Sequence, residues 1–228
     1  MIVAVTGLAR EARLIEGPDI RLVVGGGDAV ALERRLVEQL AGGARRVLSI
    51  GICGALAPHL RVGDTIIASE IVDAEGTHPT DGAWSRALAS QLPEAVLAPL
   101  AGTDEMSADR ESKARLRDRT RASAVDMESH IAARVARKHG LPFAALRIVS
   151  DAAHRTLPTA ARVAVHPSGR IDLPAVLRSI VRAPRQLPAL ARTAWEAELA
   201  FAALLRCRHV LHGGFAAAEV GQLALDAA

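Results

Sequence analysis

Two acidic motifs that flank one predicted helix carry the side chains of this sequence best suited to chemistry. They are Ala124-Val125-Asp126-Met127-Glu128-Ser129 and Leu146-Arg147-Ile148-Val149-Ser150-Asp151. The pattern between them predicts a helix over residues 130–139 and a buried strand over residues 143–149. Glu128 then lies at a strand-to-helix junction and Asp151 just past the next strand, positions that open on the ligand-binding edge of an α/β sheet. Two carboxylates that converge there can bind a sugar diol and protonate a leaving group, as cleavage of a purine–ribose bond requires.

The rest of the chain alternates short apolar runs with stretches of helical periodicity. Apolar runs that end at glycine or turn residues predict buried strands at residues 2–6, 21–24, 46–50, 65–72 and 96–100. Helical spacing predicts helices at residues 29–40, 84–92 and 111–119. This order predicts a three-layer α/β fold in which helices flank a central mixed β-sheet. A chain of 228 residues is long enough for one such domain, which we expect to span residues 1–228.

The composition favours a folded cytoplasmic protein. Hydrophobic residues make up 50% of the chain and charged residues 23%, a balance that disordered chains lack. The net charge is only +3, the arginines are scattered and aromatic residues make up 2%, so we expect no nucleic-acid partner. Cys53 and Cys207 form no CxxC pair and are expected to be reduced, buried thiols. The chain enters an apolar strand directly from Met1, unlike a signal peptide, and no apolar run reaches the roughly twenty residues of a transmembrane helix.

A glycine motif follows the third predicted strand: Gly51-Ile52-Cys53-Gly54-Ala55-Leu56-Ala57-Pro58, and then Val62-Gly63-Asp64. Glycines directly after a strand let a ligand approach the backbone closely. The segment resembles the ribose-binding loop of the nucleoside phosphorylase family, which includes purine nucleoside phosphorylase and methylthioadenosine/S-adenosylhomocysteine nucleosidase. Three more motifs resemble that family. Gly7-Leu8-Ala9-Arg10-Glu11 resembles its opening G-x-x-x-E loop, and Arg147-Ile148-Val149-Ser150-Asp151 resembles its R-x-I-S-D signature. Val125-Asp126-Met127-Glu128 resembles its V-E-M-E signature, with Asp in place of the first Glu.

The resemblance implies a role for each matching residue. Asp151 would protonate N7 of the leaving purine, and Glu11 would position the attacking water. The other residues would form a ribose site of Glu128, Met127 and Gly54, a purine site of Ser150, Asp151 and Met106, and a phosphate or water site of Gly26, Ile52 and Cys53. The family has a phosphorylase/hydrolase-like fold and needs no metal or resident cofactor. Because its pockets commonly borrow residues from a neighbouring copy, we expect a homodimer or a larger homo-oligomer.

The sequence leaves the nucleophile open. Where phosphorolytic members of the family bind phosphate with an arginine and a serine, this chain carries Ser49 and Ile52, which cannot act as an arginine fork. Arg10, Arg13 or an arginine of a neighbouring subunit could substitute, together with backbone N–H groups of residues 25–27. Phosphate would then be a co-substrate. Alternatively, the nucleophile is water.

The tail from about residue 173 differs from the rest of the chain. One clean helical face is formed by Leu173, Val176, Leu177, Ile180 and Val181, with Arg178 and Arg182 beside it. Pro184 and Pro188 interrupt this pattern before a second helical stretch at residues 190–205. One interpretation is a final helix that packs on the core. The other is a basic amphipathic element that touches a lipid-like substrate or a membrane, which would make the protein peripheral to the inner membrane.

The tail and the short chain also resemble the hopanoid-associated phosphorylase subfamily, whose members are thought to remove adenine from adenosylhopane. We therefore expect an enzyme that cleaves the N-glycosidic bond of an adenosyl compound, with adenosylhopane as the first candidate. Two alternatives within the enzyme class are a methylthioadenosine/S-adenosylhomocysteine nucleosidase and a purine nucleoside phosphorylase. A third is a non-catalytic nucleoside-binding protein that has kept the pocket.

Overall fold

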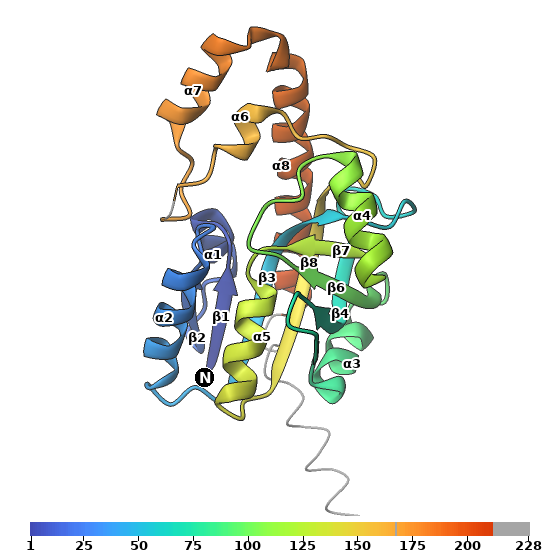
Figure 1. The fold of residues 1–228 in the computed structure, drawn as a ribbon. Coiled ribbons are helices and arrows are strands. Elements are labelled where there is room, and N and C mark those ends of the chain that lie inside the picture. The colour runs from blue at the N-terminus through green and yellow to red at the C-terminus, as the bar shows by residue number, and fades with distance from the viewer. Residues whose placement is uncertain (167, 212–228) are drawn as a thin grey trace, which may run out of the picture.

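The computed structural model describes residues 1–166 and 168–211 (Figure 1). The strands in chain order are β1 (Ile2–Thr6), β2 (Ile20–Val24), β3 (Arg46–Ala55), β4 (Thr65–Val72), β5 (Thr77–Pro79), β6 (Val96–Gly102), β7 (Ala124–Asp126) and β8 (Phe143–Asp151). The helices are α1 (Ala9–Ile15), α2 (Ala29–Leu40), α3 (Gly82–Gln91), α4 (Arg110–Thr120), α5 (Ser129–Lys138), α6 (Thr159–Arg162), α7 (Leu173–Arg182), the 3₁₀ turn η1 (Pro184–Gln186) and α8 (Leu187–Val210).

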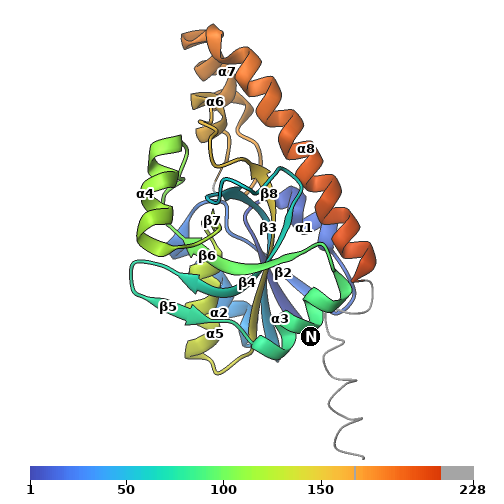
Figure 2. The ribbon, with the colours of Figure 1, turned by 90° about the vertical axis from the view of Figure 1, so that its right-hand side faces the viewer.

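The strands of the described residues form one mixed sheet (Figure 2). β1 lies between β2 and β3, parallel to both. β8 lies between β3, to which it is parallel, and β4, to which it is antiparallel. β4 pairs with β6, β6 with β7, and β7 with the last residues of β3, so that β3, β8, β4, β6 and β7 close a ring of pairings. The predicted α/β fold with a central mixed sheet is confirmed.

Helices cover both faces of this sheet because each presents one apolar face to it. On one face, α2 buries Leu32 and Leu36, and α5 buries Val135, in a single core cluster with β1 and β3. On the other face, α3 and the second half of α8 bury Leu88 and Leu204 in a separate cluster. The two clusters lie on opposite faces of the sheet, so the sheet and the helices on either side of it form the three layers that the alternating sequence pattern predicts.

The structure corrects three local predictions, two of them through long-range strand pairing. The predicted strand 46–50 runs on to Ala55, because β8 pairs with it as far as Asp151, which faces Gly54. The first part of the glycine motif, Gly51 to Ala55, therefore lies within β3 and is not a loop after a strand, and Asp151 is the last residue of β8. Glu11 was expected in a loop, but the structure places it in the first turn of α1.

The tail rises from the end of the domain as a helical hairpin (Figure 2). The second half of α8 buries Phe201 and Cys207 against the domain, whereas none of the residues of α7 is buried. Pro188 does not interrupt α8, because it lies in the first turn, where no intrahelical N–H bond is needed. Cys53 and Cys207 are buried and free, as predicted. No helix within the described residues is long and apolar enough to cross a membrane.

Candidate active site

One cavity of about 910 Å³ lies where β1, β2, β7 and β8 end. Its volume is in the range of small-molecule sites. The structure brings to its wall every residue to which the family resemblance gave a role: Glu11, Gly26, Ile52, Cys53, Gly54, Met106, Met127, Glu128, Ser150 and Asp151. They converge because each lies in the last residues of a strand of the same sheet, in the segment after such a strand, or in the first turn of a helix that follows one.

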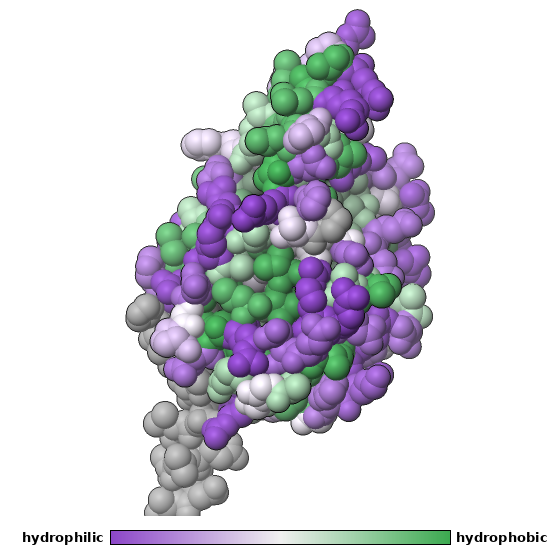
Figure 3. Space-filling view, turned by 90° about the vertical axis from the view of Figure 1, so that its left-hand side faces the viewer, coloured by the Kyte–Doolittle hydropathy of each residue, from purple (hydrophilic) through white to green (hydrophobic). Residues whose placement is uncertain are grey.

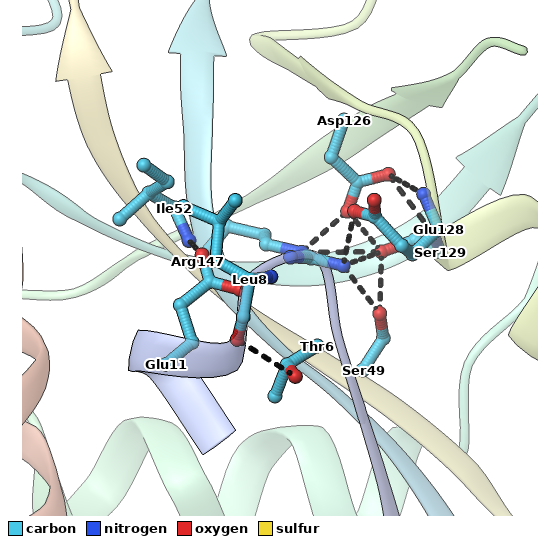
Figure 4. A network of polar contacts seen from close by, with 9 residues as sticks. All are labelled: Thr6, Leu8, Glu11, Ser49, Ile52, Asp126, Glu128, Ser129 and Arg147. Carbon is cyan, nitrogen blue, oxygen red and sulfur yellow. Dashed lines mark hydrogen bonds and ion pairs between the residues drawn. The ribbon is translucent and has the colours of Figure 1, made fainter. Parts of the chain in front are cut away.

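A buried guanidinium organises the inner wall of this cavity (Figure 4). Arg147, on β8, forms an ion pair through Nε with Asp126, and its Nη2 donates to Ser49 Oγ at 2.5 Å and to Ser129 Oγ at 3.2 Å. Glu128 Oε2 lies 3.7 Å from the same Nη2. Burial opposes the charge of Arg147, but the surrounding carboxylates, Asp126 above all, outweigh it and hold its pKa above the ordinary value. Asp126 also accepts from the Ser129 N–H at 3.0 Å, which fixes the start of α5 beside the cavity.

Glu128 is packed against bare backbone. A Cβ atom at Gly7 would lie 2.9 Å from Glu128 Oε1, and a Cβ atom at Gly25 would lie 2.9 Å from Glu128 Cγ, so only glycine leaves room at both positions. Burial raises the pKa of Glu128 to about 8, and the neighbouring carboxyls of Asp126 and Glu11 act in the same direction. Holding this carboxyl at the cavity wall therefore costs folding free energy when it is charged, which indicates a functional rather than a structural role.

We expect Glu128→Gln to make the free protein more stable at alkaline pH. A carboxyl with a folded pKa near 8 and an unfolded pKa near 4.5 binds a proton mainly in the folded state, so its contribution to stability falls as pH rises between these values. At about 1.4 kcal/mol per pKa unit, the penalty above pH 8 is on the order of a few kcal/mol, and glutamine lacks it. Between pH 5 and pH 9, the unfolding temperature should fall less in the variant than in the parent. An equal loss in both would contradict the assigned pKa.

Glu11 is held by two backbone donors. Its Oε2 accepts from the Leu8 N–H and its Oε1 from the Ile52 N–H, each at 2.8 Å. Burial raises the pKa of Glu11, although Arg147 and these N–H groups oppose the rise. A Cβ atom at Gly51 would lie 2.6 Å from Glu11 Oε1 and 2.8 Å from Arg147 Nη1, so the glycine of β3 lets these two groups approach each other. Arg147 Nη1 is buried and has no hydrogen-bond partner among the described residues.

Asp151 ends β8 with its carboxyl between the cavity and the protein interior. Ser150 Oγ lies 3.0 Å from Asp151 Oδ1 and 3.0 Å from the Cys53 carbonyl oxygen. On the inner side, Asp151 Oδ2 forms an ion pair with Lys113 of α4, whose side chain is 1% exposed. Sequence reasoning missed Lys113 because it lies 38 residues earlier, on a highly charged helix. One signal was present: Lys113 and Lys138 are the only lysines of the chain.

Helix α8 returns to the cavity beside α1. Arg10 pairs with Glu198, with 2.6 Å between Nη2 and Oε2, and its guanidinium lies 4.2 Å from the ring centroid of Phe201. Arg10 therefore already has an anionic partner at the cavity wall. Arg13, the other arginine of α1 considered for phosphate, is not among the residues that line the cavity.

Beyond these polar groups the cavity wall is largely apolar and comes from the tail and the segment before it. These lining residues are Leu157, Ala161, Ala164, Val165, Ile171, Val176, Leu190, Ala194, Ala197 and Phe201. The predicted apolar face of α7 is divided: Val176 lines the cavity, but Leu173, Leu177 and Val181 are 61–81% exposed and do not. Figure 3 shows hydrophobic surface with hydrophilic residues beside it at the α7 end of the molecule.

Comparisons with known proteins agree with this fold. A model of the phosphorylase superfamily matches residues 2–182. Native futalosine hydrolase of Helicobacter pylori is 17% identical, with a TM-score of 0.62 over 91% of this chain and 96% of that chain. Two 5′-methylthioadenosine/S-adenosylhomocysteine nucleosidases are also similar. That of Campylobacter jejuni is 17% identical, with a TM-score of 0.58 over 87% of this chain and 97% of that chain. That of Colwellia psychrerythraea, solved with adenine, is 15% identical, with a TM-score of 0.60 over 87% of this chain and 95% of that chain. A search of curated proteins finds no match.

Proposed function

This chain belongs to the phosphorylase superfamily of enzymes, and we propose that it hydrolyses the N-glycosidic bond of an adenosyl compound. The observation that carries the proposal is the convergence of Glu11, Glu128 and Asp151 on one cavity, each held in a different chemical setting. Glu128 faces the cavity beside Met127, where it can accept from the two ribose hydroxyls. We assign the purine to the part of the cavity lined by Asp151 and Ser150, and the attacking water to the part lined by Glu11.

This arrangement favours a reaction in which the purine departs before the nucleophile attacks the sugar. Ribosyl transfer passes through an oxocarbenium-like state, so carboxylates near the sugar stabilise the developing positive charge. Asp151 delivers a proton to the departing base, which would otherwise leave as an anion. Glu11, a buried base with a raised pKa, takes a proton from the attacking water.

Charge balance supports water rather than phosphate as the nucleophile. Arg147 forms an ion pair with Asp126 and also faces the carboxyls of Glu128 and Glu11, so its positive charge already has partners within the protein. Arg10 is paired with Glu198. A phosphate dianion there would meet paired cations and a buried carboxylate, which is unfavourable in a poorly solvated site. A water molecule is neutral, and in the cavity it can donate to the carboxyl of Glu11, which lines it.

The apolar part of the cavity supports a substrate with a large hydrocarbon at the five-prime position. Most residues of α6 to α8 that line it are apolar, such as Val176, Leu190 and Phe201; the polar ones are Arg162, Thr193 and Glu198, and Glu198 is already paired with Arg10. Adenosylhopane has such a substituent, and its processing in hopanoid biosynthesis is our first candidate. The alternatives are methylthioadenosine or S-adenosylhomocysteine as substrate, phosphorolysis of a purine nucleoside, and nucleoside binding without catalysis.

Release of the purine base distinguishes these functions. The purified protein is incubated with adenosylhopane, methylthioadenosine, S-adenosylhomocysteine or inosine, with the Asp151→Asn variant as control. We expect the highest kcat/KM for adenosylhopane and much lower turnover in the variant. Binding of any of these compounds without release of a base would support the binding-protein alternative and overturn the proposed reaction.

Two substitutions on α7 test the apolar wall. We expect Val176→Asp, on the cavity wall, to lower kcat/KM for an adenosyl compound with a long five-prime alkyl chain but to change that for methylthioadenosine little. A buried CH₂ is worth about 0.8 kcal/mol and tenfold corresponds to about 1.4 kcal/mol, so two lost contacts cost roughly tenfold. Val181→Asp is the matched control, because Val181 is 81% exposed and outside the cavity. An unchanged ratio of the two efficiencies in Val176→Asp would contradict the hydrocarbon assignment.

Two further proposals concern partners. The exposed stripe of Leu173, Leu177 and Val181 lies beside Arg178 and Arg182, a pattern typical of helices that rest on anionic membranes. Such a contact would make a cytoplasmic protein peripheral to the inner membrane and would bring it to a lipid substrate. The homo-oligomer expected from the family resemblance likewise stays a prediction.

A further inference from the structure

Lys113 lies directly behind the Asp151 carboxyl, on the side away from the cavity. Its ammonium pairs with Asp151 Oδ2 and also donates to the Ala152 and Arg155 carbonyl oxygens, at 3.1 and 3.3 Å. All three N–H groups therefore have acceptors, and the side chain is held in one position. Lys113 does not line the cavity, so it reaches a ligand only through Asp151.

The pairing bears on the source of the proton that Asp151 would deliver to the purine. A free aspartic acid has a pKa of about 3.9, so an isolated carboxyl in water carries no proton near neutral pH. A carboxylate held against an ammonium carries none of its own either. The pair as a unit nevertheless holds one transferable proton, because an ammonium beside a carboxylate and an amine beside a carboxylic acid have the same composition.

We propose that Lys113 and Asp151 act as one acid, in which Lys113 positions the Asp151 carboxyl and supplies the proton that Asp151 passes to the purine. The inference rests on the proposed nucleosidase function. As the C1′–N9 bond breaks, its electron pair goes to the purine. Lys113 Nζ passes a proton to the Asp151 carboxylate, and the carboxylic acid so formed gives a proton to N7. Lys113 becomes a neutral amine, Asp151 is again a carboxylate, and the base leaves uncharged.

The other half of the reaction balances this step. Water adds to C1′ and gives its proton to Glu11, so the protein as a whole neither gains nor loses a proton during bond exchange. Solvent then returns a proton to Lys113 and removes one from Glu11 when the product leaves.

A purely structural ion pair is the competing explanation, and the type of cation distinguishes the two. Arginine keeps the positive charge but cannot give up a proton in a protein. Lys113→Arg should therefore preserve the fold without restoring proton delivery. Lys113→Ala should regain activity when ethylamine, whose ammonium form is a proton donor, is added. Guanidinium should not restore it.

Substrates with different leaving groups distinguish a loss of proton delivery from a loss of folding. We expect Lys113→Met, Lys113→Arg and Lys113→Ala to lose about 10²-fold or more in kcat for adenosyl substrates, the range of general acid catalysis. A nitrophenyl riboside, which leaves as a stable phenolate, should be cleaved by these variants at nearly the parent rate. Lys138→Met is the matched control, since Lys138 is the other lysine of the chain and lies exposed at the end of α5.

Three results would overturn the inference while leaving the nucleosidase function intact. They are full activity of Lys113→Arg on adenosyl substrates, equal rescue of Lys113→Ala by guanidinium and ethylamine, and equal losses on adenosyl and nitrophenyl substrates. By contrast, failure of the parent protein to release adenine from any adenosyl compound would overturn the proposed function itself.

Discussion

Asp151→Asn is expected to lower kcat for adenine release by at least about 10²-fold and to leave binding of the nucleoside much less affected. Asparagine keeps the shape of the side chain and can accept from Ser150 Oγ, but it has no proton to give to the purine. The ammonium of Lys113 then faces a neutral amide, so part of its electrostatic stabilisation is lost and a lower unfolding temperature is also expected. The measurement is single-turnover adenine release at saturating substrate.

Two controls make the Asp151 result interpretable. A nitrophenyl riboside should still be cleaved by the variant, because its leaving group needs no proton. Circular dichroism should show the parent fold. Near-parent adenine release in a folded Asp151→Asn protein would show that the purine is protonated by another group.

Glu11→Gln should abolish hydrolysis to a similar degree, for a different reason. The carboxylate of Glu11 accepts from two backbone N–H groups, at Leu8 and Ile52. An amide can accept only through its oxygen, so its NH₂ group must face one of these donors, at a cost of about 1–3 kcal/mol. The variant thus loses the base that activates water and also the geometry of the first turn of α1. We expect kcat to fall by about 10²–10⁴-fold.

Azide gives this prediction its control. Azide ion is already a nucleophile and needs no base, so Glu11→Ala with added azide should form a ribosyl azide, detected by mass spectrometry. If Glu11→Gln hydrolyses adenosyl compounds at the parent rate, Glu11 is a structural carboxyl and the nucleophile is activated elsewhere.

Local patterns predicted most of the fold and residues that line the cavity because both are encoded in short segments of the chain. Apolar runs ended by glycine mark the strands, and Glu128 and Asp151 follow or end such runs, so they meet at one sheet edge. The length of β3 was underestimated because its last residues are extended by pairing with β8, almost a hundred residues away. Periodicity within a segment does not contain that information.

The polar partners of the predicted residues were found only in three dimensions. Lys113 reaches Asp151 from a helix whose charged sequence is typical of a solvated surface. Glu198 reaches Arg10 across 188 residues because α8 returns to α1. Arg147 and Asp126 belonged to recognised motifs, but their mutual ion pair follows from the meeting of β7 and β8 around β3. These contacts, and not the motifs, support the proposals on water and on the proton source.

Isotope labelling of the sugar product tests the central claim most directly. The protein is incubated with methylthioadenosine or adenosylhopane in ¹⁸O-labelled water, with and without phosphate, and the products are weighed by mass spectrometry. The account predicts adenine and a free ribosyl product that carries one ¹⁸O atom, at the same rate whether phosphate is present or not. A ribosyl 1-phosphate formed only when phosphate is added, or no release of adenine from either compound, would contradict it.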